Sequence, residues 1–199
     1  MLFEHLGARP RIDPTAVIAE TAVISGDVEI GPDCQVLHGA VITAEGGPIT
    51  LAACVIVMEN AVIRATSADA VHIGDHTLIG PGATVSGAVI GSEVFLATGT
   101  RVFNGARIGD RCEVRIGAIV HLRTTLPPET VVPIAWIAVG HPLGLYSPDR
   151  HDEIWAAQKE LDFPGYVFGL DRDTPDLMVQ LTERYGRSLS RHRQDRRID

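Results

Sequence analysis

The chain has 199 residues, 45% of them hydrophobic, and a formal net charge of −8 at pH 7. These values allow a sizeable core and predict one domain with an appendage, and only three cysteines argue against a disulfide framework. No apolar run approaches the roughly 18 residues of a membrane span, and the first residues lack the basic region of a targeting signal, so we expect a cytoplasmic protein.

An aliphatic residue recurs every six residues through most of the chain. A period of six fits neither the 3.6 residues of a helical turn nor the alternation of an ordinary strand, so it indicates an internal repeat. The repeated residues are Ile12, Ile18, Ile24, Ile30, Val36 and Ile42, then Leu51, Val57 and Ile63, then Ile73, Ile79 and Val85, and, after one shortened step, Ile90, Leu96, Val102, Ile108, Val114, Val120, Leu126 and Val132.

Each six-residue unit, or hexad, is interpreted as a short strand that ends in a tight corner. A compact residue follows four positions after the aliphatic one, as at Ala22 and Cys34, and glycine often follows it directly, as at Gly31 and Gly74. One hexad has a single large side chain to bury, so hexads must stack on one another to form a core. Burial of each aliphatic side chain contributes about 1.5–3 kcal/mol. The predicted fold class is an all-β solenoid.

The repeat resembles the left-handed parallel β-helix of hexapeptide-repeat proteins, in which three hexads form one triangular coil. Within that class, residues 9–145 resemble the γ-carbonic anhydrase-like branch. The matching stretches are residues 26–31, residues 39–42 with the Gly-Gly-Pro loop at 46–48, and residues 72–80. The resemblance implies a homotrimer. This expectation depends on the resemblance, because hexad spacing alone does not show which faces associate.

Three interruptions of the repeat predict where loops leave the coil. Three residues are inserted after Ile42, four are inserted after Ile63, and one is missing between Val85 and Ile90. Both insertions follow the third hexad of a coil, so the two loops are expected to project from the same edge. The resemblance implies that this edge borders an active site.

Residues 146–199 are expected to form a helical extension with a basic tail. A helix start at Ser147 and Pro148 is followed by helically spaced apolar residues up to Leu161, residues 163–169 are interpreted as an extended connection, and a second helix is expected after Thr174. These helices are expected to cover the open end or the flank of the coil, because an exposed solenoid edge needs a cap.

The tail from Arg184 to Asp199 holds six arginines and two aspartates. Nucleic-acid binding is one interpretation of such a run, but neither interleaved aromatic residues nor a known motif supports it. The favoured interpretation is a solvated helix end or a segment that pairs with an acidic neighbour in an oligomer.

In the enzymes that the chain resembles, three histidines hold Zn²⁺. The first lies directly after the aliphatic residue of the third hexad of a coil. The second lies two residues after the aliphatic residue of the second hexad in the next coil, and the third lies directly after the aliphatic residue of the third hexad in that coil. Counted in hexads, these places fall on Arg64, Pro81 and Ser86. Arginine and proline offer zinc no lone pair, and a single serine is a poor ligand. We therefore expect no metal site.

Other parts of the family's site differ as well. The family's Arg-x-Asp stretch falls on residues 43–45 and its Gln-Asp pair on Met58 and Glu59, so zinc-dependent hydration of carbon dioxide is expected to be absent. Arg64 would place a permanent cation where the metal was, and Glu59 could pair with it. This pocket is interpreted as a salt-bridged subunit seam or as a site for a small anion, with a purely structural ion pair as the alternative.

The sequence thus predicts a γ-carbonic anhydrase-like protein without a zinc site, which acts as a trimeric scaffold or binds a small anion or metabolite. The candidate binding residues are Arg64, Glu59, Ser86, Pro81, Thr43 and Glu45.

Two enzymatic interpretations remain open. Many hexapeptide-repeat proteins transfer an acyl group from a coenzyme A thioester with a histidine as general base, and His38, with Glu59 to orient it, is the candidate base here. The long loop that carries the catalytic histidine in sugar acetyltransferases is missing. A third interpretation is a zinc-dependent carbonic anhydrase whose ligands have been relocated, with a site shared between subunits.

Overall fold

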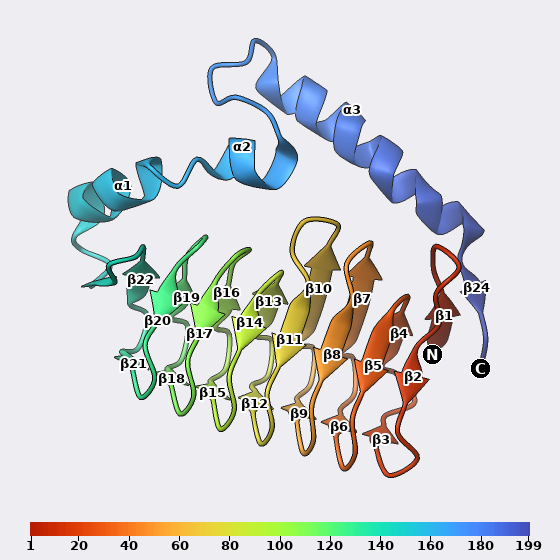
Figure 1. Ribbon diagram of the computed structural model, residues 1–199. Helices are drawn as coiled ribbons and strands as arrows, with labels where there is room; N and C mark the ends of the chain where they lie inside the picture. The colour runs from red at the N-terminus through yellow and green to blue at the C-terminus, as the bar shows by residue number, and fades with distance from the viewer.

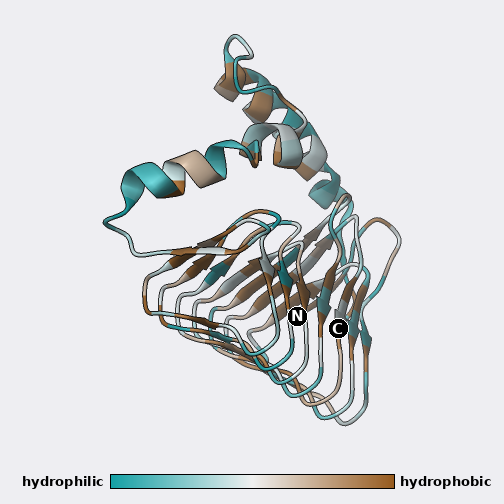
Figure 2. Ribbon diagram, turned by 60° about the vertical axis from the view of Figure 1, so that its left-hand side comes forward, coloured by the Kyte–Doolittle hydropathy of each residue, from teal (hydrophilic) through white to brown (hydrophobic).

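The computed structural model describes residues 1–199 and shows a solenoid whose coils stack along one axis (Figure 1). Three parallel sheets form its three faces, and consecutive strands from β1 to β22 lie on different faces. The predicted left-handed β-helix of hexapeptide repeats is therefore confirmed. Figure 2, which looks more nearly along the stack, shows the triangular outline of the coils.

The strands of the three faces follow one another in a fixed order, and the faces are numbered by that order. The first face contains β2 (Arg11–Ile12), β5 (Val28–Ile30), β8 (Ile49–Leu51), β11 (Val71–Ile73), β14 (Val89–Ile90), β17 (Arg107–Ile108) and β20 (Thr125–Leu126). The second face contains β3 (Val17–Ile18), β6 (Gln35–Val36), β9 (Ile56–Val57), β12 (Leu78–Ile79), β15 (Phe95–Leu96), β18 (Glu113–Val114) and β21 (Val131–Val132).

The third face is the widest sheet and includes both ends of the chain. It contains β1 (Leu2–Glu4), β4 (Val23–Ser25), β7 (Val41–Glu45), β10 (Val62–Thr66), β13 (Thr84–Ser86), β16 (Arg101–Val102), β19 (Ile119–Val120) and β22 (Ile137–Val139), with the antiparallel strands β23 (Gly144–Tyr146) and β24 (Arg196–Arg197) at its edges.

The repeated aliphatic residues form the core inside the triangle. Those from Ile24 to Val132 are at most 3% exposed, and they belong to one continuous cluster of 35 buried residues. Ile12 and Ile18, in the first coil, are only partly buried because no complete coil lies below them. The six-residue count therefore identified the inward side chains correctly.

The two inserted loops lie side by side on the third face, as predicted (Figure 1). The strands that lead into them, β7 and β10, are longer than their neighbours and pair in register from Val62 with Val41 to Thr66 with Glu45. The same register aligns Arg64 with Thr43 on one side and with Ser86 on the other. The outward residues of this face therefore form columns that run along the solenoid.

Three helices follow the last coil and lie over the third face: α1 (His151–Lys159), α2 (Phe163–Phe168) and α3 (Leu177–Leu189), which continues into the 3₁₀ helix η1 (Ser190–Gln194). The predicted helix after Thr174 is confirmed as α3. None of the helices has the length and apolar character that a membrane crossing requires. The division at residues 9–145 and 146–199 stays a prediction, and β1 and β24 lie outside its β-helical part.

The prediction of an extended connection over residues 163–169 is wrong, because most of this segment forms α2. The Asp162 carboxylate accepts a hydrogen bond from the Gly165 N–H at 3.3 Å, and Pro164 stands in the first turn. Gly169 ends the helix in the left-handed region, with φ +64°. An Asp cap, an early proline and a terminal glycine are sufficient to define so short a helix.

The basic tail pairs with acidic groups of its own chain. β24 lies antiparallel to β1, and Arg196 donates a hydrogen bond to Glu4 at 2.9 Å. A hydrogen bond from Arg197, together with contacts from the chain's amino terminus, lowers the pKa of Asp199 to about 2. Arg196 thus ties the last residues to the first strand, and pairing of the tail with an acidic neighbour in an oligomer stays a prediction.

Candidate functional site

A cavity of about 470 Å³ lies between the outer surface of the third face and the helices α2 and α3. Its floor is made by side chains from β7, β10 and β13 and from the residues that directly follow β10 and β16. Its roof is made by the helices. The floor residues are Glu45, Arg64, Thr66, Ser67, Ser86, Phe103 and Asn104, and the roof residues include Phe163, Phe168, Leu181, Arg184, Tyr185 and Leu189.

Arg64 is the central cation of the floor. One of its terminal nitrogens lies 3.8 Å from a Glu45 carboxylate oxygen, and its guanidinium lies 5.5 Å from the centre of the Tyr185 ring. Its Nε atom is buried and has no hydrogen-bond partner. A buried N–H of a charged group without a partner costs free energy, so Arg64 has an unused donor at the cavity.

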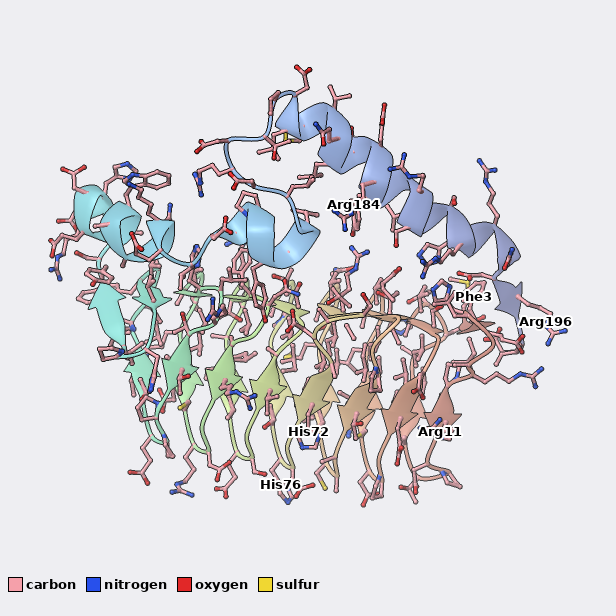
Figure 3. All side chains as sticks on the ribbon, turned by 45° about the horizontal axis from the view of Figure 1, so that its top comes forward. Phe3, Arg11, His72, His76, Arg184 and Arg196 are labelled. Carbon is pink, nitrogen blue, oxygen red and sulfur yellow. The ribbon has the colours of Figure 1, made fainter.

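A second arginine, Arg184, reaches the cavity from the roof. Its side chain points from α3 toward α2 (Figure 3), and its Nη1 donates to the Gly169 carbonyl at 3.1 Å. Two guanidinium groups and one carboxylate, that of Glu45, therefore surround a space whose other walls combine four aromatic rings with aliphatic and small polar side chains.

Three of the six predicted binding residues, Glu45, Arg64 and Ser86, line this cavity. Thr43 stands beside Arg64 in the same column but does not reach the space. Glu59 and Pro81 lie at the corner between the second and third faces, where their carbonyls accept hydrogen bonds from Gly82 and Gly99, and they do not line the cavity.

The predicted pairing of Arg64 with Glu59 is wrong, because the ion-pair partner of Arg64 is Glu45. Thr43 and Arg64 are register partners, as are Glu45 and Thr66. Side chains two residues apart on a strand point to the same side, so Glu45 and Arg64 both project outward from neighbouring coils. Glu59 lies at the corner before β10, and no ion pair joins its carboxylate to Arg64.

The candidate general base does not meet its proposed partner. The Nδ1 atom of His38 lies 2.9 Å from the Thr21 hydroxyl, and the Glu59 side chain forms no hydrogen bond or ion pair. His72 and His76 lie on the side of the solenoid away from the helices (Figure 3). The structure thus does not bring His38 and the Glu59 carboxylate together. His72 and His76 do not line the cavity.

The three positions predicted to replace zinc ligands, Arg64, Pro81 and Ser86, offer little to a metal ion. Arg64 and Ser86 are direct neighbours in register, and Pro81 lies at the adjacent corner. Together these three side chains offer a zinc ion one neutral hydroxyl oxygen, whereas protein zinc sites use imidazole, thiolate or carboxylate groups. The donor set therefore does not fit a zinc ion.

The loop after β10 anchors α2 above the floor. The Tyr166 hydroxyl donates to Asp69 at 2.8 Å, and the Asn104 side-chain amide donates to the other oxygen of the same carboxylate at 3.3 Å. Burial, reinforced by the bond to Asp69, raises the pKa of Tyr166. Sequence analysis found the inserted loop but missed its partner, because 97 positions separate Asp69 from Tyr166.

His121 lies next to the cavity floor as a neutral ring. It stacks on Phe103 with ring centres 5.6 Å apart, and its Nδ1 accepts a hydrogen bond from the Leu122 N–H at 2.8 Å. Burial lowers the pKa of His121. An accepting Nδ1 requires the tautomer with the proton on Nε2, so protonation would replace this hydrogen bond by a clash of two N–H groups.

His121 therefore predicts a pH dependence of stability. Because the unfolded side chain has a pKa of about 6.5 and the folded one a lower value, the unfolded state binds more protons below about pH 6.5, and stability falls as the pH falls. When the pH is lowered from about 7.5 to about 5.5, the melting temperature of His121→Gln should fall less than that of the wild type. His72→Gln on the first face is the control, and equal losses in His121→Gln and wild type would contradict the assignment.

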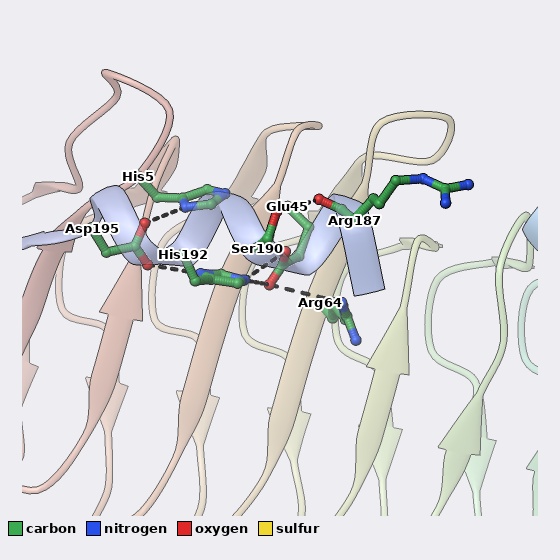
Figure 4. Close-up of polar contacts among 7 residues, drawn as sticks. All are labelled: His5, Glu45, Arg64, Arg187, Ser190, His192 and Asp195. Carbon is green, nitrogen blue, oxygen red and sulfur yellow. Dashed lines mark hydrogen bonds and ion pairs between the residues drawn. The ribbon is translucent and has the colours of Figure 1, made fainter. Parts of the chain in front are cut away.

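A second polar cluster lies just beyond the carboxyl end of α3 and shares Glu45 with the cavity (Figure 4). Asp195 bridges His5 and His192, with contacts of 2.5 Å and 2.7 Å, and Nε2 of His192 lies 3.0 Å from Glu45. The bond to Asp195, aided by the Glu45 charge, raises the pKa of His192. Although burial acts in the opposite direction, the bonds from the two histidines lower the pKa of Asp195. No sequence signal linked these residues, because 190 positions separate His5 from Asp195.

Comparison with known proteins finds relatives over the β-helical part. No protein-family model matches the chain. Over 124 residues, 59% of this chain, it is 26% identical to the mitochondrial γ carbonic anhydrase 1 of Arabidopsis thaliana, of which the match covers 45%. Over 143 residues, 65% of this chain, it is 35% identical to the carboxysome assembly protein CcmM of Synechocystis sp., of which the match covers 20%. The chain thus spans less than half the length of these two relatives.

A solved structure shows the same fold over almost the whole chain. A hexapeptide transferase family protein from Anaplasma phagocytophilum superimposes with a TM-score of 0.52 at 21% identity, covering 92% of this chain and 95% of that one. The protein therefore has the left-handed β-helix fold of hexapeptide-repeat proteins, and over its β-helical part it is similar in sequence to γ-carbonic anhydrases and to a carboxysome assembly protein.

Proposed function

We propose that the protein is a γ-carbonic anhydrase-like protein without hydratase activity that binds a small carboxylate in the cavity below α2 and α3. The observation that carries this proposal is Arg64, whose buried Nε has no partner at the cavity. Arginine binds carboxylates through two parallel hydrogen bonds. The ligand is a small organic acid with an apolar or aromatic body, because Phe103, Phe163 and Phe168 are among the residues that line the space.

Binding of this kind is consistent with the size and the roof of the cavity. A volume of about 470 Å³ falls within the usual range of small-molecule sites. The roof consists of α2 and α3, which the Tyr166–Asp69 hydrogen bond and the tail hold in place. A ligand would contact both the fixed floor and this roof, so binding should stabilise the whole chain.

The proposal includes a homotrimer that associates through the second face. This face is not covered by the helices, and the outward residues Ile56, Leu78 and Phe95 are register neighbours on three successive coils, with Phe95 44% exposed. Exposed apolar patches of this kind mark interaction sites. Light scattering of the purified chain should give the mass of about three 21.4-kDa chains, and the mass of one chain would contradict the trimer.

The test of binding is the shift of the melting temperature in a panel of small aliphatic and aromatic carboxylates, with bicarbonate, coenzyme A and acetyl-coenzyme A included. We expect a carboxylate to raise the melting temperature of the wild type and to bind Arg64→Ala roughly ten- to a hundredfold more weakly, because a hydrogen bond to a charged group contributes about 1.5–3 kcal/mol.

Arg101→Ala is the matched control, since Arg101 is an exposed arginine of the same sheet outside the cavity. Equal affinity in Arg64→Ala and Arg101→Ala would contradict the proposal. A shift with acetyl-coenzyme A and none with carboxylates would favour acyl transfer instead. Hydration of carbon dioxide at a rate proportional to the protein concentration would show that the protein is a hydratase.

A further inference from the structure

Two histidines from opposite ends of the chain meet at one carboxylate. His5, in the turn after β1, has a side chain that is only 3% exposed, and its Nδ1 lies 2.5 Å from one oxygen of Asp195. Nδ1 of His192 lies 2.7 Å from the other oxygen, and the two imidazole rings stack with centres 4.5 Å apart (Figure 4). Each residue thus offers a donor atom, and these atoms all lie within 4.8 Å of one another.

We propose that His5, His192 and Asp195 form a zinc site. Two imidazoles and one carboxylate are a ligand set that Zn²⁺ accepts, with water in the fourth position. Metal–ligand distances of about 2.0–2.2 Å place tetrahedral donor atoms about 3.3 Å apart. The contacts of 2.5 Å and 2.7 Å would have to open by less than about 1 Å. The two Nδ1 atoms, which lie within 4.8 Å of each other, would have to come to about the same 3.3 Å separation.

Glu45 supplies the outer contact that such sites require. Metal-binding histidines usually donate their second ring N–H to a carboxylate, which orients the ring. Nε2 of His192 lies 3.0 Å and 3.1 Å from the two oxygens of Glu45, so Nδ1 is left to face the ion. The side chains of Asp195 and Glu45, 18% and 16% exposed, bring two negative charges to the cation.

This site would fasten the end of the chain to its beginning. His192 lies in η1 directly after α3, Asp195 precedes β24, and β24 pairs with β1 just before His5. None of the three ligands lies in the column of Arg64, and the site is complete within one chain. A bound ion would hold α3, and with it the cavity roof, against the third face.

The test uses the full chain, freed of metal with a chelator and then dialysed against Zn²⁺. We expect the wild type to bind about one zinc ion per chain and to melt at a higher temperature with zinc than with chelator. His5→Gln and His192→Gln should each lose the bound zinc and the temperature shift. The shift should also be present at a Co²⁺-loaded site, with the absorption spectrum of four-coordinate cobalt.

His72→Gln and His76→Gln are the matched controls and should bind zinc as the wild type does. Glu45→Gln, which keeps all three ligands, covers the case in which a ligand variant fails to fold, and it should bind zinc about 10- to 100-fold more weakly. The site is ruled out if the wild type binds no zinc. It is also ruled out if zinc binding survives unchanged in His192→Gln and Glu45→Gln, or disappears in a control.

Discussion

Ile90→Ala is expected to lower the free energy of unfolding by about 2–5 kcal/mol. Ile90 is completely buried, and it pairs in register with Ile73 and Ile108 of the coils on either side. It also follows the shortened step of the repeat, so no spare chain is available to close the cavity that alanine would leave. Urea denaturation at a fixed protein concentration measures the loss.

Val89→Ala is the matched control for this core prediction. Val89 is the adjacent residue on β14, but its side chain points outward and is 38% exposed. Its replacement should change the free energy of unfolding by less than about 0.5 kcal/mol. Comparable losses in the two variants would mean that the six-residue count does not define the inward side chains.

Gly31→Ala is expected to destabilise the protein by about 1–3 kcal/mol. A Cβ atom at this corner would lie 2.7 Å from the Ala52 carbonyl oxygen and 2.9 Å from that of Leu51, both in the next coil. These are backbone atoms of a stacked neighbour, and Gly31 donates its N–H to the Leu51 carbonyl. The coils would therefore have to move apart to admit a methyl group.

The control for Gly31 is Gly186, in the last turn of α3. A Cβ atom there would meet nothing within 4 Å, so Gly186→Ala should raise stability by up to about 1 kcal/mol through helix propensity. Thermal unfolding of both variants separates the close approach at the corner from the general effect of removing a glycine. Stabilisation by both substitutions would contradict tight stacking of the coils.

The sequence predicted the solenoid well because the repeat depends on local chain geometry. A period of six aligns Ile63 with Ile42 and Val85 regardless of what surrounds the coil, and the register of Arg64 with Ser86 follows from it. The same reasoning placed the loops after β7 and β10 on one edge. Counting along the chain is reliable here because each coil stacks only on its neighbours.

The site was predicted only in part, because its roof and its polar partners come from distant segments. Arg64 was identified, but its cation–π contact with Tyr185 depends on how α3 lies over the third face. The sequence predicted a helix after Thr174, but not which side chains of the coil that helix covers. The pairing of Arg64 with Glu59 failed because an offset along the chain does not show on which side of a corner a side chain projects.

The most direct measurement of the central claim is a crystal structure of the full chain with the carboxylate that binds most tightly. The account predicts the carboxylate group within hydrogen-bond distance of the Arg64 guanidinium, between the third face and α3. A metal ion held by residues of this column at a boundary between subunits, or a carboxylate bound elsewhere while this cavity holds only water, would contradict it.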